Sequence, residues 1–262
     1  MTESRTTLEI DDGLAHLRLS WVEGRNGIDM AMVRSLGEHV DRIEADPGVR
    51  AVLIDAEGPA FTVGGDLNHL EAQLDRLPDE LHDMISDYHR TLAQLARLPV
   101  PIVVAVHGAV AGGGLGLLWV ADLVLAAPDL RIATGFVHLA LSGDGGSSWH
   151  LPRLVGLRRA QELILGGRQL GAQEAAEWGL VTRVVPAAEL AASAEAQARG
   201  WASGPTYALG RMKRLLLDSA TNTYPEQLAA EREAIVACAR TQDAKEGIAA
   251  FTARRAARFQ GR

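Results

Sequence analysis

The sequence predicts an α/β fold that ends in a long helical region, and three observations support this prediction. Short apolar runs of strand type alternate with amphipathic, helix-type stretches through residues 1–200. Two of these runs, Ala51–Ile54 and Ile102–Val106, lead directly into glycine-rich loops, which fits buried strands that end in a loop. From Glu189 onward the chain is rich in Ala, Leu, Glu and Arg, which favours helix. We therefore divide the chain into a core over residues 1–200 and a helical region over residues 201–262.

The first elements are expected in the order strand, strand, helix, strand. Asp11-Asp12-Gly13 is a hairpin-turn signal, and Asp46-Pro47-Gly48 ends the first helix. The predicted ranges are Thr7–Ile10 and Ala15–Leu19 for the hairpin, Met30–Ala45 for the helix and Ala51–Asp55 for the next strand. Residues 71–97 have a helical pattern, but Pro78 and the polar stretch 75–87 predict a mobile segment that precedes the helix and could cover a pocket.

The second half repeats the alternation of strands and helices. Its predicted strands are Ile102–Val106, Leu123–Ala126, Arg131–Ala133 and Leu180–Val185. Its predicted helices start at Gly113, span Arg158–Leu165 and Gln173–Trp178, and fill the chain from Glu189 onward.

Composition excludes several classes of function. The 262 residues are 47% hydrophobic and carry a formal net charge of −7, which argues against a nucleic-acid partner because phosphate contacts need a basic face. No stretch is long and apolar enough to span a membrane, and Met1–Asp12 has no signal-peptide core, so a cytoplasmic protein without a membrane partner is expected. One cysteine and histidines without metal-ligand spacing predict no metal site. The chain has no dinucleotide fingerprint, phosphate-binding loop or serine-hydrolase elbow.

Two glycine clusters and one acid carry the chemical signal. The clusters are Gly64-Gly65 within Ala60–Leu67 and Gly112-Gly113-Gly114, and the acid is Asp144 within Ser142–Gly146. Glycine lets a ligand approach the main chain, and N–H groups at the start of a helix favour a developing negative charge. Two such donors can form an oxyanion hole. The alternative is that these glycines form tight turns and that Asp144 stabilises a turn or caps a helix.

This pattern resembles the crotonase superfamily, the enoyl-CoA hydratase and isomerase family, over nearly the whole chain. The resemblance is carried by Asn26-Gly27-Ile28, the Ala60–Leu67 loop, the Gly108–Gly114 loop, Leu151–Gly156 and Glu246–Phe251. It implies a crotonase-like ββα spiral core with a C-terminal helical trimerisation region, and hence a homotrimer or a dimer of trimers. It also implies an acyl-CoA thioester substrate, so that coenzyme A enters with the substrate and no prosthetic group is expected.

The resemblance also assigns roles to individual residues. The backbone N–H groups of Gly65 and Gly113 would be the oxyanion donors, beside Asp144. Residues facing coenzyme A would include Arg25, Phe61, Val63 and Asp66, while Arg255 matches a basic position that reaches coenzyme A of a neighbouring subunit. The favoured alternative is that Arg255 belongs to a solvated face, as exposed arginines in a tail usually do.

Departures from the family pattern narrow the reaction. Hydratases of this family typically use two glutamates, but here the first position is Gly116 and the second falls at Phe136, so neither can transfer a proton. Asp144 is then the only acid or base expected in the pocket. It matches the aspartate of phenylacetate-pathway enoyl-CoA isomerases and dienoyl-CoA isomerases, in which one carboxylate moves a proton between two carbons. Gly143 stands where those isomerases usually have proline.

Other reactions stay open. Asp144 also resembles the nucleophile of aryl-CoA dehalogenases, whose partner tryptophan matches Phe136 and whose catalytic histidine is expected to lack a counterpart, since His89 lies about one helical turn too early. Hydration or hydrolysis using Asp144, and a non-catalytic acyl-CoA-binding protein, are further alternatives. His138 and His150 flank the loop and are expected to be structural. The pocket walls are expected to be apolar and to include Leu70, Leu74, Met84, Phe136 and Leu141.

Overall fold

The computed structural model describes residues 4–261 and contains a mixed sheet with the strand order β1-β2-β3-β4-β6-β9. β1 pairs antiparallel with β2, and every other neighbouring pair in this sheet is parallel. The strands are β1 (Thr6–Asp11), β2 (Leu14–Leu19), β3 (Ala51–Ala56), β4 (Ile102–Val106), β6 (Leu123–Ala126) and β9 (Arg183–Val184). The predicted strands agree closely except at β9, which is shorter than the apolar run Leu180–Val185.

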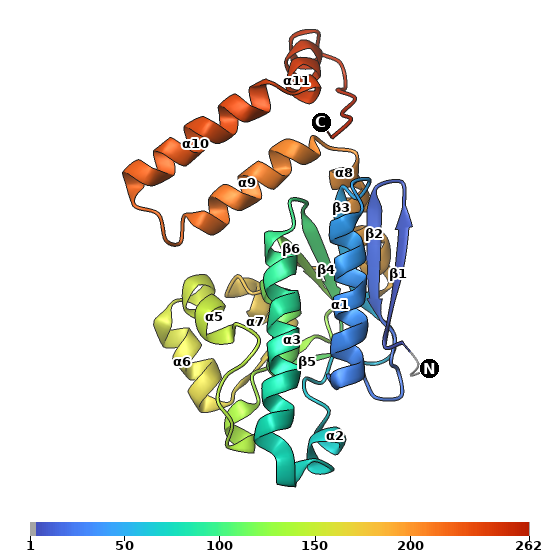
Figure 1. The fold of residues 1–262 in the computed structure, drawn as a ribbon, viewed down its shortest axis with the longest axis vertical. Coiled ribbons are helices and arrows are strands. Elements are labelled where there is room, and N and C mark those ends of the chain that lie inside the picture. Colours follow the sequence, from blue (N-terminus) through green and yellow to red (C-terminus); the bar gives the residue numbers. More distant parts are fainter. Residues whose placement is uncertain (1–3, 262) are drawn as a thin grey trace.

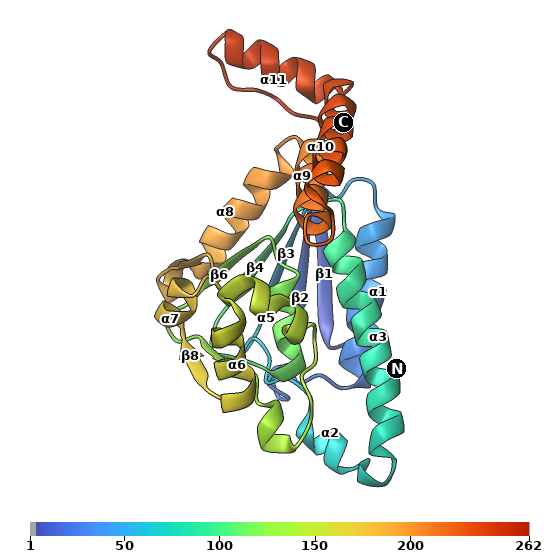
Figure 2. The same ribbon diagram turned by 90° about the vertical axis from the view of Figure 1, so that its left-hand side faces the viewer.

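Helices cover both faces of this sheet, which explains why its central strands are apolar along their whole length. One face packs against α1 (Met30–Ala45) and α3 (Leu77–Arg97), and the other packs against α8 (Leu190–Ala202), as Figure 2 shows. Alternate residues serve the two sides: Val52 and Ile54 join the larger core, while Ala51 and Leu53 contact the small side chains of α8.

The segment before β4 differs from the prediction. The chain after the first glycine cluster forms α2 (Leu67–Glu71) and a short 3₁₀ turn over Leu74–Arg76. The stretch 75–87, which was expected to be mobile, lies at the end of this turn and in the first half of α3, a continuous helix of 21 residues. Pro78 lies in the first turn of α3, where a missing N–H costs no hydrogen bond. The polar residues of the stretch 75–87 therefore form the outer side of a regular amphipathic helix.

A second, smaller sheet joins β5 (Ala109–Ala111), β7 (Arg131–Ala133) and β8 (Gln169–Gly171). The second glycine cluster follows β5 and forms a 3₁₀ turn over Gly112–Leu115, which continues into α4 (Gly116–Trp119). Three further helices cover this part of the chain: α5 (Ser147–Val155), α6 (Leu157–Gly166) and α7 (Ala172–Glu177). The sequence predicted α6 and α7 but not α5, which carries Pro152 inside it.

The C-terminal helices α9 (Thr206–Asp218), α10 (Tyr224–Ala239) and α11 (Gln242–Thr252) extend away from the sheet (Figure 1). Lys213 of α9 anchors them through an ion pair with Asp122, with 2.9 Å between Nζ and Oδ2. Several apolar side chains on these helices are exposed, among them Leu216, Ile235 and Phe251. A division of the chain near residue 200 stays a prediction. In the described part of the chain, no helix is long and apolar enough to cross a membrane.

Candidate active site

The two glycine loops lie directly against each other. Thr62 forms a parallel bridge with Val110, which joins the first loop to β5. Gly64 has φ +83°, and a Cβ atom at this position would lie 2.8 Å from the carbonyl oxygen of Ala111. Only glycine permits both this backbone conformation and this approach. The fold therefore brings together two loops that are about fifty residues apart in the sequence.

The N–H groups of Gly65 and Gly113 are not used by the local secondary structure. The bridge between Ile28 and Gly65 uses the carbonyl of Gly64 and the N–H of Asp66, so the N–H of Gly65 takes no part in it. Gly113 is the second residue of the 3₁₀ turn, and the first N–H groups of such a turn lack partners within it. Both glycines line the same pocket.

Asp144 lies beside Gly113. A Cβ atom at Gly113 would lie 2.7 Å from Oδ2 of Asp144, so the carboxylate occupies the space that a side chain at Gly113 would need. The next residue, Gly145, has φ +60°, and its own Cβ would lie 2.5 Å from the carbonyl oxygen of Gly113. Because Gly113 and Gly145 carry no side chains, the Asp144 loop can pack directly on the oxyanion loop.

His89 of α3 contacts the Asp144 carboxylate, with 2.6 Å between Nε2 and Oδ1. The expectation that Asp144 is the only acid or base in the pocket is therefore wrong, because His89 lines the same pocket. The expectation that His89 does not match the catalytic histidine of the dehalogenases stays a prediction. The Asp144 side chain is 21% exposed and the His89 side chain 48% exposed, so the pair lies where the pocket meets solvent. The Asp144 side chain does not cap a helix here. It binds an imidazole instead.

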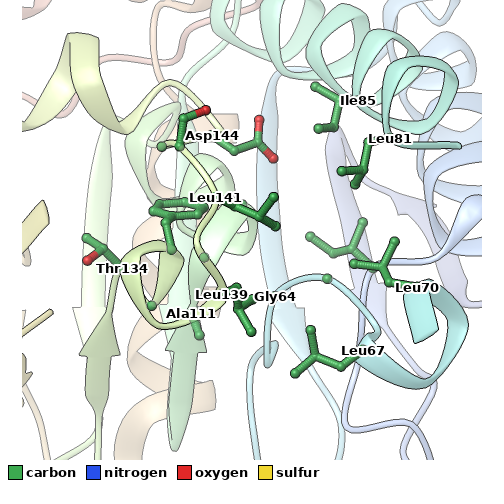
Figure 3. Close-up of a pocket in the computed structure, with 18 of the residues that line it drawn as sticks. Gly64, Leu67, Leu70, Leu81, Ile85, Ala111, Thr134, Leu139, Leu141 and Asp144 are labelled. Carbon is green, nitrogen blue, oxygen red and sulfur yellow. The ribbon is translucent and has the colours of Figure 1, made fainter. Parts of the chain in front are cut away.

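The pocket is a cavity of about 480 Å³ with mostly apolar walls. Figure 3 shows Asp144 and Leu141 on one side, facing Leu81 and Ile85 of α3. Of the expected wall residues, Leu70, Met84, Phe136 and Leu141 line the cavity. Leu74 does not line it, because its side chain points to solvent and is 62% exposed.

Tyr88 adds a buried hydroxyl to the same site. Its OH donates a hydrogen bond to the carbonyl oxygen of Gly113 over 3.0 Å, and the residue is 2% exposed. Burial, together with the negative charge of Asp144, raises the pKa of the Tyr88 phenol far above its usual value. Tyr88 is therefore held as a protonated phenol that donates to the carbonyl oxygen of Gly113.

Gly116 and Phe136, which the resemblance matches to the two hydratase glutamates, carry no group that can transfer a proton. A Cβ at Gly116 would lie 2.6 Å from Cδ1 of Leu92 and 3.0 Å from the carbonyl oxygen of Gly145. Phe136, at the second position, lines the pocket with an apolar ring. The space beside Gly116 is thus filled by packing, and Phe136 forms part of the hydrophobic wall.

The residues expected to face coenzyme A lie in different environments. Arg25 is exposed at φ +52°, and Val63 lines the pocket. The Phe61 side chain is fully buried in the core, so only its main chain could face a ligand. Asp66 accepts a hydrogen bond from the N–H of Asn68 and caps α2. Their role in coenzyme A binding stays a prediction.

Arg255 is held within its own chain. Its guanidinium donates to both carboxylate oxygens of Glu246, over 2.6 Å and 2.8 Å. This contact lowers the pKa of Glu246 to about 2. An anion that recruits Arg255 would have to compete with this fork-shaped ion pair.

The two histidines that flank the Asp144 loop differ. His138 lines the pocket, and its ring packs so closely on Gly167 that a Cβ there would lie 2.7 Å from its Nε2. His150 lies outside the lining of the pocket and packs edge-on against Trp149. Burial, with a smaller effect of Arg153, lowers the pKa of His150 to about 4.

Comparison with known proteins identifies the family and the fold. The family model for enoyl-CoA hydratase/isomerase matches residues 9–262. The chain belongs to the enoyl-CoA hydratase/isomerase family. Its fold is the crotonase fold, as the sequence predicted: the enoyl-CoA hydratase from Polaromonas sp. JS666 superimposes with a TM-score of 0.92 at 31% identity, covering 97% of this chain and 99% of that one.

Relatives within the enoyl-CoA hydratase/isomerase family have different reactions in their names. The 1,2-epoxyphenylacetyl-CoA isomerase of Escherichia coli is 35% identical over 254 residues, which are 97% of each chain. The 4-chlorobenzoyl coenzyme A dehalogenase-2 of an Arthrobacter species is 30% identical over 223 residues, covering 85% of this chain and 81% of that one. The family therefore fixes an acyl-CoA enzyme but not which reaction it performs.

Sequence reasoning missed Tyr88, and it considered His89 but set it aside. A signal was available, because Leu81, Met84, Ile85, Tyr88 and His89 follow the spacing of one helical face, and all of them line the pocket. In the described residues, no group of three His, Cys, Asp or Glu side chains is placed to hold a metal ion.

Proposed function

We propose that this protein is an enoyl-CoA isomerase that moves a carbon–carbon double bond through a thioester enolate. The observation that carries the proposal is the position of the Asp144 carboxylate, which lies against Gly113 in an apolar cavity. The two positions that the resemblance matches to the hydratase glutamates, Gly116 and Phe136, carry no acid. One carboxylate is sufficient for an isomerase, because it can remove a proton from one carbon and deliver a proton to another, so that no net proton and no water are consumed.

The thioester carbonyl is proposed to bind between the N–H groups of Gly65 and Gly113. Both groups are outside the local hydrogen-bond pattern, and both glycines line one cavity. Donors already in place stabilise negative charge on the carbonyl oxygen as the enolate forms, and each contributes about 2.7 to 4 kcal/mol to lowering the barrier in comparable sites.

Asp144 is proposed to transfer the proton. Its carboxylate removes a proton from an allylic carbon, and the electron pair of that C–H bond moves into the enolate while the double bond shifts. The protonated Asp144, which can exchange its proton with solvent because the pair with His89 is partly exposed, then delivers a proton to the other end of the allylic system, and this restores the thioester carbonyl. His89 binds the second oxygen of the carboxylate and so holds the first toward the substrate.

The same proposal places the rest of the substrate and the subunit contacts. The acyl group occupies the apolar cavity, and coenzyme A enters past Arg25, Val63 and Asp66, with Arg255 available to a neighbouring subunit. We propose a homotrimer or a dimer of trimers built by α9–α11, whose exposed apolar side chains would be covered in it. We expect the enzyme in the cytoplasm.

Isotope exchange tests this proposal. The protein is incubated in deuterated water with enoyl-CoA thioesters of different chain length and ring content, and mass spectrometry follows deuterium at the α and γ carbons. The isomerase should exchange deuterium, and Asp144→Asn should abolish exchange while still binding the thioester. Exchange at the wild-type rate in that variant would remove Asp144 from its role. A protein that binds the thioesters without exchange would be a non-catalytic acyl-CoA-binding protein.

A second candidate is substitution at an aromatic ring, and the contact between His89 and Asp144 favours it. Asp144 would attack a halogenated ring carbon and displace halide, and water would then hydrolyse the aryl ester to leave a hydroxyl group. His89 is close enough to activate that water. Incubation with 4-chlorobenzoyl-CoA in ¹⁸O water decides, because this reaction releases chloride and labels the carboxylate of Asp144 on a single turnover, whereas hydration of an enoyl-CoA labels only the product.

A further inference from the structure

Tyr88 joins the helix that lines the acyl pocket to the oxyanion loop. The residue is almost completely buried, and its hydroxyl donates to the carbonyl oxygen of Gly113 over 3.0 Å. Its ring also borders the space above Gly113, where Cε1 would lie 3.9 Å from a Cβ at that position. Tyr88 thus touches the glycine that carries one of the proposed oxyanion donors.

The main chain at Gly113 needs such a restraint. The residue has no side chain to pack, and it lies in a turn that begins with Gly112 at φ +51°. A run of glycines has many accessible backbone conformations, so a precisely aimed N–H must be held by contacts from outside the run. A hydrogen bond to the carbonyl limits rotation of the Gly113 main chain, which carries the N–H at its other end.

We infer that Tyr88 is a positioning residue for the oxyanion hole, which it aligns by fixing the carbonyl of Gly113. The inference rests on the proposed function, since it assumes that the N–H of Gly113 binds a thioester oxygen. The role is separate from proton transfer. The phenol is fully occupied by the Gly113 carbonyl, and burial beside Asp144 disfavours its ionisation.

His89 follows Tyr88 directly and binds Asp144. Consecutive residues of one helix thus hold the two halves of the site: Tyr88 holds the loop that carries the oxyanion donor, and His89 holds the acid or base. This arrangement predicts that the two substitutions fail differently. Tyr88→Phe should weaken polarisation of the thioester carbonyl, whereas a change at His89 should alter proton transfer.

The test uses Tyr88→Phe, which keeps the ring and removes only the hydroxyl. Thr91→Val is the matched control. It removes another buried hydroxyl from the same helix, one that bonds only to the carbonyl of Asp87 in the preceding turn. Two properties are measured for each protein: the rate of deuterium exchange into an enoyl-CoA, and the infrared carbonyl band of bound cinnamoyl-CoA labelled with ¹³C at the thioester carbon.

Tyr88→Phe is expected to lower kcat for exchange by about 10- to 100-fold, less than the loss of a donor itself, with KM changed by less than about 3-fold. In Tyr88→Phe, the shift of the carbonyl band of bound cinnamoyl-CoA, relative to the same probe in water, should be smaller than the shift in the wild-type protein. Thr91→Val should behave as wild type in both measurements. 3-Fluorotyrosine at position 88, a stronger donor in the same place, should retain the full band shift even if Tyr88→Phe folds poorly.

The outcomes separate the possible explanations. Unchanged exchange and an unchanged band in Tyr88→Phe overturn the inference. Slower exchange with an unchanged band, or equal losses in Thr91→Val, also overturns it, because either result assigns Tyr88 to packing. If the wild-type protein neither binds the probe nor exchanges deuterium, the proposed function fails first and the inference fails with it.

Discussion

Adding one methyl group at Gly113 is the sharpest perturbation that the site offers. In Gly113→Ala the new Cβ would lie 2.7 Å from Oδ2 of Asp144, whereas ordinary contacts begin at 3.4 Å. The carboxylate must therefore move by about 0.7 Å. Its other oxygen is held by His89 at 2.6 Å, so the movement stretches or breaks that hydrogen bond.

The expected loss of activity follows from this displacement. Misplacing a reacting group by about 1 Å can cost about 10²-fold in rate, and a stretched contact with His89 weakens control of the carboxylate further. We therefore expect the rate of deuterium exchange into an enoyl-CoA to fall by about 10²-fold. Stability should change by less than about 1 kcal/mol, because alanine lowers the entropy of the unfolded chain and this offsets part of the crowding.

The measurement combines exchange kinetics with urea unfolding, and Gly200→Ala is the control. A Cβ at Gly200, in α8, would meet no atom within 4 Å, so this variant adds the same methyl group without crowding. It should exchange deuterium at the wild-type rate. If Gly113→Ala also keeps its exchange rate within about 3-fold, the carboxylate beside Gly113 is not the group that moves the proton, and the mechanism proposed above is refuted.

Three further predictions concern packing and charge. Gly116→Glu should not create a hydratase, and its free energy of unfolding in urea should fall by about 1–3 kcal/mol because the new side chain collides with Leu92. Water addition to an enoyl-CoA at the rate of an ordinary hydratase would contradict this. His150 is kept neutral with a pKa of about 4, so its contribution to stability is present above about pH 6.5 and is lost as the pH falls toward 4. In His150→Phe the free energy of unfolding in urea should depend less on pH over this range, by on the order of 1–2 kcal/mol after allowance for partial exposure, and an equally steep dependence would exclude His150 as its source. Lys213→Met should lower stability by about 2–4 kcal/mol, since it leaves the half-buried Asp122 without its cation; thermal unfolding within 1 °C of wild type would show that this ion pair does not anchor α9.

Much of the fold could be predicted from local patterns. The run Ile102–Val106 and the alternation in Leu14–Leu19 have the burial that their sequences suggest, and α1 begins and ends where its caps predict. The errors have local causes. Pro78 was taken as an interruption, but in the first turn of α3 it is compatible with helix. Pro152 lies inside α5, a position that a sequence pattern argues against.

The candidate site was predictable where glycine and aspartate carry the signal, and less so where side chains meet across the fold. Gly65, Gly113 and Asp144 line one cavity, as expected from their loops. The contact between His89 and Asp144 joins residues that are 55 positions apart and depends on how α3 sits against the Asp144 loop. Helical spacing alone could have placed His89 on the pocket face, but only the tertiary structure gives its partner.

The helix α3 connects recognition of the acyl group to the chemistry. The pocket space that the acyl chain would fill is lined by Leu81, Met84 and Ile85, and the next turn of the same helix carries Tyr88 and His89. An acyl group that displaces α3, or that is too small to pack against it, therefore disturbs both the oxyanion loop and Asp144. The choice of acyl group therefore affects kcat as well as binding affinity. Enlarging the apolar wall of the pocket for a bulkier acyl chain will also require changes that keep Tyr88 and His89 in position.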